Sequence, residues 1–301
     1  MSNKIIITGG AGFIGTNLCH YLEESNDQVA VVDDLTSGTK ENLPEGVGFH
    51  ELDIRKTEAL TEVFKGFDIV VHLAALPRVQ FSIDKPQLTH DVNVNGTLSV
   101  LEAARTAGVK RVVFAASSSA YGDQETLPLS IDLPASPKSP YALHKLIGEE
   151  YMKLWSELYD IETVSLRFFN VYGPFLDPEG PYALVIGRFL KQAADGVPLT
   201  VTGDGTQTRD FTHVSDVCNA IVKAATVSGV GAGEVLNIGG GVQTTINDLA
   251  KQISDDIEYV APRHEPKHTL ADVSVTKEKL DWEPTVKLED GLAKLKKEFL
   301  G

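Results

Sequence analysis

The sequence predicts a doubly wound α/β fold, in which helices cover both faces of a parallel sheet. Three observations predict it: short apolar runs rich in β-branched residues, helical patterns between these runs, and a glycine-rich turn directly after the first run. Buried parallel strands have continuous apolar sequences because both faces of their sheet are covered. Strands that alternate with helices indicate crossover connections, and this order is typical of the Rossmann-type architecture.

The expected elements follow one another along the first half of the chain. Apolar runs predict strands at residues 4–10, 28–35, 48–54, 67–76 and 110–119, and helical spacing predicts helices at 12–25, 87–107 and 140–158. After the run at 162–174 glycine and proline become frequent, and a last helical pattern begins near Leu288. We therefore expect an NAD-binding domain at residues 1–170 and a smaller α/β substrate-binding lobe mainly at 171–301. Some segments of the lobe should return to the first domain, with a cleft between the two.

Composition and charge exclude several classes of protein. The chain has 301 residues, of which 42% are apolar and 23% charged, the balance of a globular protein. No run approaches the ~20 apolar residues that cross a bilayer, and the N-terminus lacks a secretory signal, so we expect a cytoplasmic protein with no membrane partner. The net charge of −15 argues against nucleic acid as a partner. The two cysteines, Cys19 and Cys218, are expected to be buried free thiols and are too few for a zinc site.

The glycine-rich turn "GGAGFIG" follows the first expected strand and contains Gly9, Gly12 and Gly15 in a G-x-x-G-x-x-G spacing. Glycine allows a sharp turn and a close approach of the backbone to a pyrophosphate, which binds the N–H groups at the start of the next helix. The same spacing also fits an ordinary glycine turn. The strand before it and the helix after it favour a dinucleotide site.

Two aspartates extend this prediction. Asp33 ends the second expected strand, where a carboxylate can accept hydrogen bonds from both ribose hydroxyls and favours NAD over NADP. Asp33 or Asp34 could instead cap a turn. Asp53 follows the third expected strand and could reach the adenine amino group, or it could be an ordinary loop residue.

Tyr141 and Lys145, in "SPYALHK", would face the same side of a helix. A phenol normally loses its proton near pH ~10, and a neighbouring ammonium group and a cationic nicotinamide ring would lower that pKa. Such a tyrosine can take a hydroxyl proton while a hydride leaves the same carbon. Isolated Tyr-x-x-x-Lys pairs are usually helix-surface contacts. Here the pair follows "AASSSAYG" at a strand end, where Ser117, Ser118 and Ser119 could hold a sugar oxygen or make a simple turn.

Together these stretches resemble the extended short-chain dehydrogenases/reductases, specifically the NAD-dependent nucleotide-sugar epimerases and dehydratases. The resemblance is carried by "TGGAGFIG", "VVDDLTSG", "VVHLAA", "VNVNGTLSVLEAAR", "FAASSSAYG", "SPYALHK", "RFFNVYGP", "GDGTQTRDFTHVSDV" and "EVLNIGGG". It implies a catalytic triad of Ser117, Tyr141 and Lys145 and tightly held NAD. The residues implied around NAD are Gly9, Gly12, Phe13, Ile14, Gly15, Asp33, Asp34, Leu35, Thr36, Ser37, Gly38, Asp53, Ile54, Leu73, Ala74, Ala75, Asn93, Tyr141, Lys145 and Phe169.

The resemblance also implies a UDP-sugar substrate. Arginine forks suit a diphosphate, and the family resemblance points to Arg209 and Arg263 for this role, although either could be a surface ion pair. The "RHEP" stretch around Arg263 departs from the Arg-x-Gly-Asp usual in the family. The residues implied around the substrate are Ser117, Ser118, Ser119, Tyr141, Asn170, Leu184, Val185, Phe189, Val201, Arg209 and Arg263.

The three serines favour one reaction within the family. Dehydratases usually carry Thr-Asp-Glu at the positions of Ser117–Ser119, and decarboxylases usually carry glutamate at Ser119. Without a carboxylate there, a 4-keto sugar can only be reduced again. If the sugar turns over before the hydride returns, the product is the C4 epimer. We therefore expect a 4-epimerase for UDP-glucose and UDP-galactose, in which NAD is reduced and reoxidised in each cycle.

Alternatives and partners remain open. Thr269 occupies the position where a bulky tyrosine excludes N-acetylated sugars in the family, so UDP-N-acetylglucosamine is an alternative substrate. A dehydratase or decarboxylase that uses carboxylates from elsewhere in the cleft is another alternative, and a non-catalytic NAD-binding protein is a third. The helices expected at 87–107 and 140–158 carry apolar residues on more than one face, and the resemblance implies that they pair across a two-fold axis into a homodimer.

Overall fold

A seven-stranded parallel sheet forms the centre of the computed structural model, which describes residues 2–179, 183–262 and 266–301. The strand order is β11–β6–β5–β4–β1–β2–β3, and every neighbouring pair is parallel. The strands of this sheet are β1 (Lys4–Thr8), β2 (Gln28–Asp33), β3 (Gly48–Glu51), β4 (Ile69–His72), β5 (Arg111–Ser117), β6 (Glu162–Phe168) and β11 (Ala232–Ile238). The predicted α/β fold class and the five predicted strands are confirmed.

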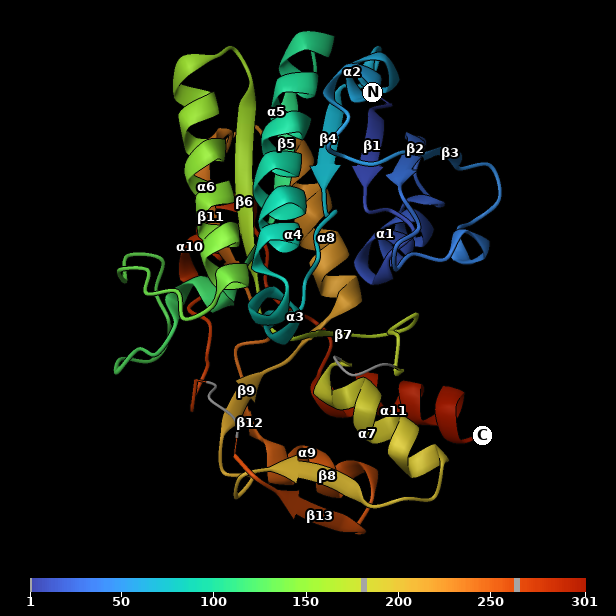
Figure 1. Ribbon diagram of the computed structural model, residues 1–301, viewed down its shortest axis with the longest axis vertical. Helices are drawn as coiled ribbons and strands as arrows, with labels where there is room; N and C mark the ends of the chain where they lie inside the picture. The colour runs from blue at the N-terminus through green and yellow to red at the C-terminus, as the bar shows by residue number, and fades with distance from the viewer. Residues whose placement is uncertain (1, 180–182, 263–265) are drawn as a thin grey trace.

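Helices cover both faces of the sheet (Figure 1). One face is covered by α1 (Phe13–Leu22) and α8 (Val214–Thr226), and the other by α2 (Thr57–Phe64), α5 (Gly96–Ala107) and α6 (Pro140–Leu158). Successive strand residues point to opposite faces, so Ile5 and Ile7 lie in the apolar cluster under α1 and α8, while Ile6 lies in the cluster under α2, α5 and α6. Cys19 and Cys218 are buried free thiols on the first of these faces, as expected.

The helix predicted at residues 87–107 is present but is not continuous. It comprises α4 (Pro86–His90), a π-helical turn at Asp91–Asn95, and α5. A further short helix, α3 (Val79–Asp84), precedes it. The π turn inserts an extra residue in the helical ladder, and such insertions are frequent at functional sites.

A second lobe lies beyond the carboxyl ends of the sheet, towards which the strand arrows point in Figure 1. Its apolar core brings together α7, α9, α11 and short strands, with Phe189, Leu199 and Val201 fully buried. The elements of this lobe are β7 (Val171–Tyr172), α7 (Val185–Ala194), β8 (Leu199–Thr202), β9 (Thr208–Asp210), β10 (Thr212–His213), β12 (Gln243–Thr245), α9 (Ile246–Ile253), β13 (Ile257–Val260) and α11 (Leu288–Leu300).

Segments from the second half of the chain also join the sheet. Strand β11 pairs with β6, α8 covers one face, and α10 (Ser274–Leu280) packs against both β11 and α8. Division of the chain at residue 170 stays a prediction. Among the described helices, none has both the length and the apolar character that a membrane span requires.

Helix α6 carries a buried ion pair that connects it to the sheet. Glu149 and Arg167 of β6 have side chains 3% and 6% exposed, and the guanidinium donates to both carboxylate oxygens at 2.9 and 2.7 Å. The guanidinium also lies 4.4 Å from the ring centroid of Tyr121, whose hydroxyl donates to Asn237 at 2.7 Å. Because charges are costly to bury unless they are paired, each partner needs the other.

We expect Glu149→Leu to lower the free energy of unfolding by about 3–5 kcal/mol, because it leaves the Arg167 guanidinium buried without its carboxylate. The double variant Glu149→Leu/Arg167→Met should recover most of this loss. The matched control is Glu150→Leu, since Glu150 is an exposed neighbour on the same helix. Urea unfolding measures all three variants, and equal costs for Glu149→Leu and Glu150→Leu would contradict the expectation.

Candidate active site

A cavity of about 1080 Å³ lies at the carboxyl ends of β1, β2, β4 and β5, between the sheet and the second lobe. Parallel α/β sheets bind ligands at this edge. The sheet side contributes the turn after β1, the end of β2, the segment after β4 and the end of β5, and the second lobe contributes residues such as Leu184 and Arg209. The cavity therefore joins the two regions that the sequence predicts to bind a dinucleotide and a substrate.

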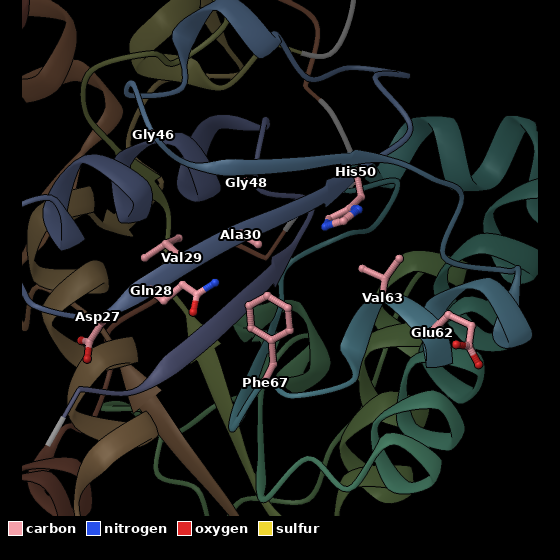
Figure 2. A pocket seen from close by; sticks show the side chains of 10 residues that line it. All are labelled: Asp27, Gln28, Val29, Ala30, Gly46, Gly48, His50, Glu62, Val63 and Phe67. Atoms are coloured by element: carbon pink, nitrogen blue, oxygen red, sulfur yellow. The ribbon is translucent and has the colours of Figure 1, made fainter.

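A second hollow, of about 640 Å³, lies beside the edge strand β3 and is lined by residues of β2, β3 and α2 (Figure 2). Its charged side chains Asp27 and Glu62 lie on opposite sides of it in Figure 2. None of the site residues predicted from the sequence lines this hollow. The described residues also include no group of histidines, cysteines and carboxylates that could hold a metal ion.

The glycine-rich turn leaves an open cradle at the start of α1. Gly9 has φ +70°, and a Cβ there would lie 2.6 Å from the backbone nitrogen of Ala74. A Cβ on Gly15 would lie 2.4 Å from the carbonyl oxygen of Gly9. Gly12 is the N-cap of α1 and no side chain caps it, so the first N–H groups of the helix and the positive end of its dipole face the cavity and suit an anionic group.

Asp33 is nearly buried, at 8% exposure, at the end of β2. Its two oxygens accept hydrogen bonds from the backbone N–H groups of Ala11, at 3.0 Å, and Leu35, at 2.9 Å. Burial raises the pKa of Asp33, and these two N–H donors oppose the rise. Asp33 thus caps a turn and lines the cavity at once. Each oxygen can accept a further hydrogen bond, so the carboxylate can receive two ribose hydroxyls.

Most of the residues predicted around the dinucleotide line this cavity, and four do not. Those that do are Gly9, Gly12, Phe13, Ile14, Gly15, Asp33, Asp34, Thr36, Ser37, Gly38, Ile54, Leu73, Ala74, Ala75, Tyr141 and Lys145. Leu35 has φ 57° and lies outside the lining. Phe169 is fully buried, whereas its neighbour Phe168 lines the cavity. Asp53 is held by Arg55, whose Nε lies 3.0 Å from each carboxylate oxygen, and Arg55 lines the cavity in its place.

The fourth residue, Asn93, does not line the cavity but binds the backbone of Leu76, which does. Its side-chain amide accepts from the N–H of Leu76 at 2.7 Å and donates to the carbonyl of Leu76 at 3.1 Å. Asn93 lies in the π turn, and Thr97 of the next turn donates to its carbonyl and contacts the buried ring of His72 at 3.0 Å. Burial lowers the pKa of His72 to about 3, so this ring is neutral.

Tyr141 and Lys145 are placed by the start of α6. Ser139 is the N-cap and accepts the N–H of Ala142 at 3.1 Å, and Pro140 occupies the first helical position, which suits its missing N–H. Tyr141 lines the cavity together with Ser117 at the end of β5, whose hydroxyl oxygen accepts from the N–H of Ser119 at 3.2 Å and from its hydroxyl at 2.9 Å. The Lys145 ammonium donates to the carbonyl of Ala115 at 2.6 Å and lies 6.0 Å from the centroid of the Tyr141 ring.

The protonation of this group differs from the expectation that Lys145 lowers the pKa of Tyr141. Burial raises the pKa of Tyr141, and the groups that oppose the rise are the Ser117 hydroxyl and the charge of Arg78. Burial also lowers the pKa of Lys145 to about 8, against the attraction of Glu149. Lys145 therefore holds the backbone at Ala115, and the protein alone does not make the phenol acidic.

The residues predicted around the substrate separate into two groups. Those that line the cavity are Ser117, Ser118, Ser119, Tyr141, Asn170, Leu184 and Arg209, together with Thr269. Phe189 and Val201 are fully buried in the core of the second lobe, and Val185 packs against that core. Arg263 lies outside the described residues. The three apolar positions came from the resemblance alone, which does not show which face of a helix or strand meets the cavity.

Four charged residues that the sequence analysis did not name also line the cavity, namely Arg55, Arg78, Lys138 and Asp177. Arg78 follows the segment after β4, and Asp177 follows β7. Burial lowers the pKa of Arg78, and the charge of Asp177 opposes this effect. The two residues are far apart in the sequence, so no local pattern could have joined them, although "ALPR" after an expected strand was a signal for Arg78.

Comparisons with known proteins extend over the whole chain. The family model for the NAD dependent epimerase/dehydratase family matches residues 5–239. A curated relative, the UDP-glucose 4-epimerase of Mycolicibacterium smegmatis, is 36% identical over 305 residues, which cover 97% of this chain and 96% of the relative.

Two solved structures have nearly the same fold. The UDP-glucose 4-epimerase of Thermotoga maritima with UDP-glucose has a TM-score of 0.93 and 36% identity, and the match covers 98% of both chains. The UDP-N-acetylglucosamine 4-epimerase of Methanobrevibacter ruminantium, in complex with UDP-N-acetylmuramic acid, has a TM-score of 0.94 and 33% identity, and the match covers 99% of this chain and 98% of that one. The similarity thus includes the second lobe as well as the sheet.

Proposed function

The chain belongs to the NAD-dependent epimerase/dehydratase family, and we propose that it interconverts UDP-glucose and UDP-galactose by inverting C4 of the sugar. The curated relative and the two solved structures named above are UDP-sugar 4-epimerases, which favours epimerisation of a UDP-sugar. The observation that carries the proposal is that Tyr141 lines the same cavity as Ser117, Ser118 and Ser119. These three hydroxyls stand where an eliminating enzyme would need a carboxylate.

NAD is the cofactor, and the residues at the sheet edge fit it. The glycine cradle and the uncapped start of α1 suit the pyrophosphate. The Asp33 carboxylate suits the adenosine ribose, and its negative charge disfavours the additional phosphate of NADP. When bound, NAD supplies the chemistry of accepting a hydride from C4 and returning it. The chain's own residues handle the proton and the orientation of the sugar.

Tyr141 is the base and then the acid of the proposed reaction. Ser117 can hold the 4-oxygen of the sugar while the Tyr141 oxygen takes the hydroxyl proton, because both side chains line the same cavity. After the 4-keto sugar turns over, Tyr141 returns the proton to the 4-oxygen. Lys145 fixes the carbonyl of Ala115 two residues before Ser117 and so keeps the strand end in place.

A direct assay incubates the NAD-loaded protein with UDP-galactose and measures UDP-glucose. We expect conversion, and we expect Tyr141→Phe to reduce the rate about a hundredfold or more, because the variant loses the proton-transferring oxygen. Tyr159→Phe is the matched control, since Tyr159 is a partly exposed tyrosine just after the far end of α6. Absence of conversion by the loaded wild type, or full activity of Tyr141→Phe, would overturn the proposal.

UDP-N-acetylglucosamine is a second candidate substrate because Thr269 is a small residue in the cavity wall. Its N–H donates to the carbonyl of Thr208 at 3.3 Å, and its hydroxyl accepts the N–H of Asp210 at 3.3 Å. A bulky side chain there would reduce the space for an N-acetyl group while leaving the backbone contact intact.

We expect Thr269→Tyr to reduce turnover of UDP-N-acetylglucosamine at least about tenfold while it retains most turnover of UDP-galactose, because a lost fit costs a few kcal/mol at most. Thr269→Val is the control, since it removes the hydroxyl at nearly constant size. Parallel assays with both substrates decide the question. An equal loss of both activities in Thr269→Tyr would show that Thr269 is not a selective gate.

We also propose that a second copy of the chain covers the outer face of α3, α4 and α6. Large apolar side chains are exposed there, including Ile83 at 51%, Leu88 at 44%, Leu154 at 41% and Leu158 at 61%. The three helices pack against one another, so these side chains lie on neighbouring helices of one side of the molecule. A patch of this kind marks an interface, and two-fold dimers are the commonest assemblies.

Sedimentation measures the assembly directly. The wild type should sediment as a dimer, and Leu154→Glu/Leu158→Glu should sediment as a folded monomer because two charges would be buried at the interface. Val242→Glu is the control, since Val242 is a 65% exposed apolar residue away from these helices. A monomeric wild type would refute this part of the proposal.

A further inference from the structure

A fully buried carboxylate lies behind the substrate side of the cavity. Asp210 ends β9, is 0% exposed and does not itself line the cavity. Three backbone N–H groups donate to its two oxygens, those of Gly240 at 2.6 Å, Gly241 at 3.2 Å and Ala271 at 2.9 Å. A buried charge is costly unless hydrogen bonds compensate it, and hydrogen bonds to a carboxylate are stronger than those between neutral groups.

These donors connect Asp210 to two other segments of the chain. Gly240 and Gly241 follow β11, the edge strand of the sheet, and Ala271 precedes α10. The turn after β11 can approach closely because it lacks side chains. A Cβ on Gly239 would lie 2.9 Å from one carboxylate oxygen of Asp210, and a Cβ on Gly240 would lie 3.1 Å from the other. The carboxylate therefore holds β9 of the second lobe against the end of a sheet strand.

The backbone of Asp210 contacts residues that line the cavity. Asn170, Arg209 and Thr269 belong to the lining. The Asn170 amide donates to the Asp210 carbonyl at 3.0 Å, and the Asp210 N–H donates to the Thr269 hydroxyl at 3.3 Å. Arg209 directly precedes Asp210 in the same strand. Three segments that are distant in the sequence thus meet at one residue.

The conformation of Asn170 indicates that its position is determined by these contacts. Its φ is 27°, in the left-handed region that residues other than glycine seldom occupy. Such a conformation persists where the surrounding structure determines it. Asn170 binds the Asp210 carbonyl, and its own carbonyl accepts the N–H of Thr212 at 3.3 Å. The position of Asn170 therefore follows the position of β9 and β10.

We propose that Asp210 is a positioning residue for substrate binding, whose buried carboxylate anchors β9 to the sheet and so places Asn170, Arg209 and Thr269 around the UDP-sugar. This inference rests on the proposed function, which puts a UDP-sugar in this part of the cavity. Tyr141 and Ser117 belong to α6 and β5, which are held by other contacts. Loss of the anchor should therefore act on substrate affinity more than on the chemical step.

Asp210→Asn tests the anchor at nearly constant shape. An amide has one oxygen and an NH₂ group that cannot accept, so in either orientation at least one of the three N–H groups loses its acceptor. In the NAD-loaded protein we expect the Kd for UDP and the KM for UDP-galactose to rise about tenfold while kcat changes less than about threefold, since the loss falls on binding. Hydrogen exchange at Gly240 and Ala271 should become faster. Calorimetric titration with UDP and steady-state kinetics measure the two effects.

Asp216→Asn is the matched control. Asp216 is likewise buried, at 4% exposure, and accepts the hydroxyl of Thr285 at 2.7 Å and the N–H of Val286 at 3.0 Å. Neither Asp216 nor these two partners line the cavity. This variant should also lower the melting temperature, because a buried donor loses part of its acceptor, but it should leave the Kd for UDP and the KM unchanged. The comparison separates positioning from overall stability.

The outcomes distinguish this inference from the proposed function. An unchanged Kd for UDP in Asp210→Asn, or an equal rise in Asp216→Asn, overturns the inference, even if the wild type epimerises UDP-galactose. If Asp210→Asn weakens UDP binding and the wild type epimerises no UDP-sugar, the proposed function fails and the anchor stands.

Gly240→Ala keeps the question open to test if Asp210→Asn does not fold. A Cβ on Gly240 would lie 2.3 Å from the carbonyl oxygen of Phe211, so the turn must shift and its N–H must move relative to the Asp210 carboxylate. We expect this variant to raise the Kd for UDP by a smaller factor than Asp210→Asn. An unchanged Kd in Gly240→Ala, together with faster hydrogen exchange in the turn, would contradict the anchor.

Discussion

The close approach of α6 to β5 is the constraint on which the site depends. Gly148 allows it, because a Cβ at this position would lie 2.5 Å from the ring of Phe114. At this separation Lys145 is 5% exposed, and its ammonium can reach the Ala115 carbonyl while it lies 4.8 Å from the Phe114 ring centroid. The same approach brings Tyr141 to the strand end at Ser117. Lys145 thus loses most of its contact with water, and Tyr141 is placed at the strand end. The buried Glu149–Arg167 ion pair lies in the same interface between α6 and the sheet.

A second constraint acts from behind the cavity, through neutral hydrogen bonds. The hydroxyl of Thr8 on β1 contacts the ring of His72 on β4 at 2.7 Å, and the other ring nitrogen contacts Thr97 of α5. The π turn then offers the Asn93 amide to the segment before Arg78. Because His72 stays uncharged, this chain of contacts crosses the sheet without a buried charge. It connects the centre of the fold to the part of the cavity wall that follows β4.

Local patterns made much of this arrangement predictable. The glycine cradle, Asp33 at the end of β2, and the Tyr141–Lys145 pair on α6 are each defined by residues close together in the sequence, so their spacing together with the strands and helices around them locates them. The π turn was not predictable, because no sequence pattern of a helix marks it. Instead, Asn93 in this turn makes hydrogen bonds to Leu76, which lies outside the helix. Phe189 and Val201 illustrate a different limit, since an apolar residue near a site and one in the adjacent core have the same sequence signature. Arg78 and Asp177 line the same cavity only because the fold brings distant segments of the chain together.

An acidic protein tends to repel anionic ligands, so the cavity needs local groups that attract them. The two ends of the cavity use different groups for this purpose. The chain carries a net charge of −15, and a dinucleotide and a UDP-sugar are both anionic. At the nucleotide end Arg55 is already bound to Asp53 and Asp91, so the uncapped start of α1 is left as the main attraction for a pyrophosphate, and a helix dipole carries no net charge. At the sugar end the cations Arg78 and Arg209 are supplied by side chains. A backbone cradle binds a resident cofactor by shape, whereas side-chain charges can also act on the proton that moves during the reaction. The cavity therefore combines an uncharged backbone cradle at the start of α1 with two side-chain cations elsewhere in its lining.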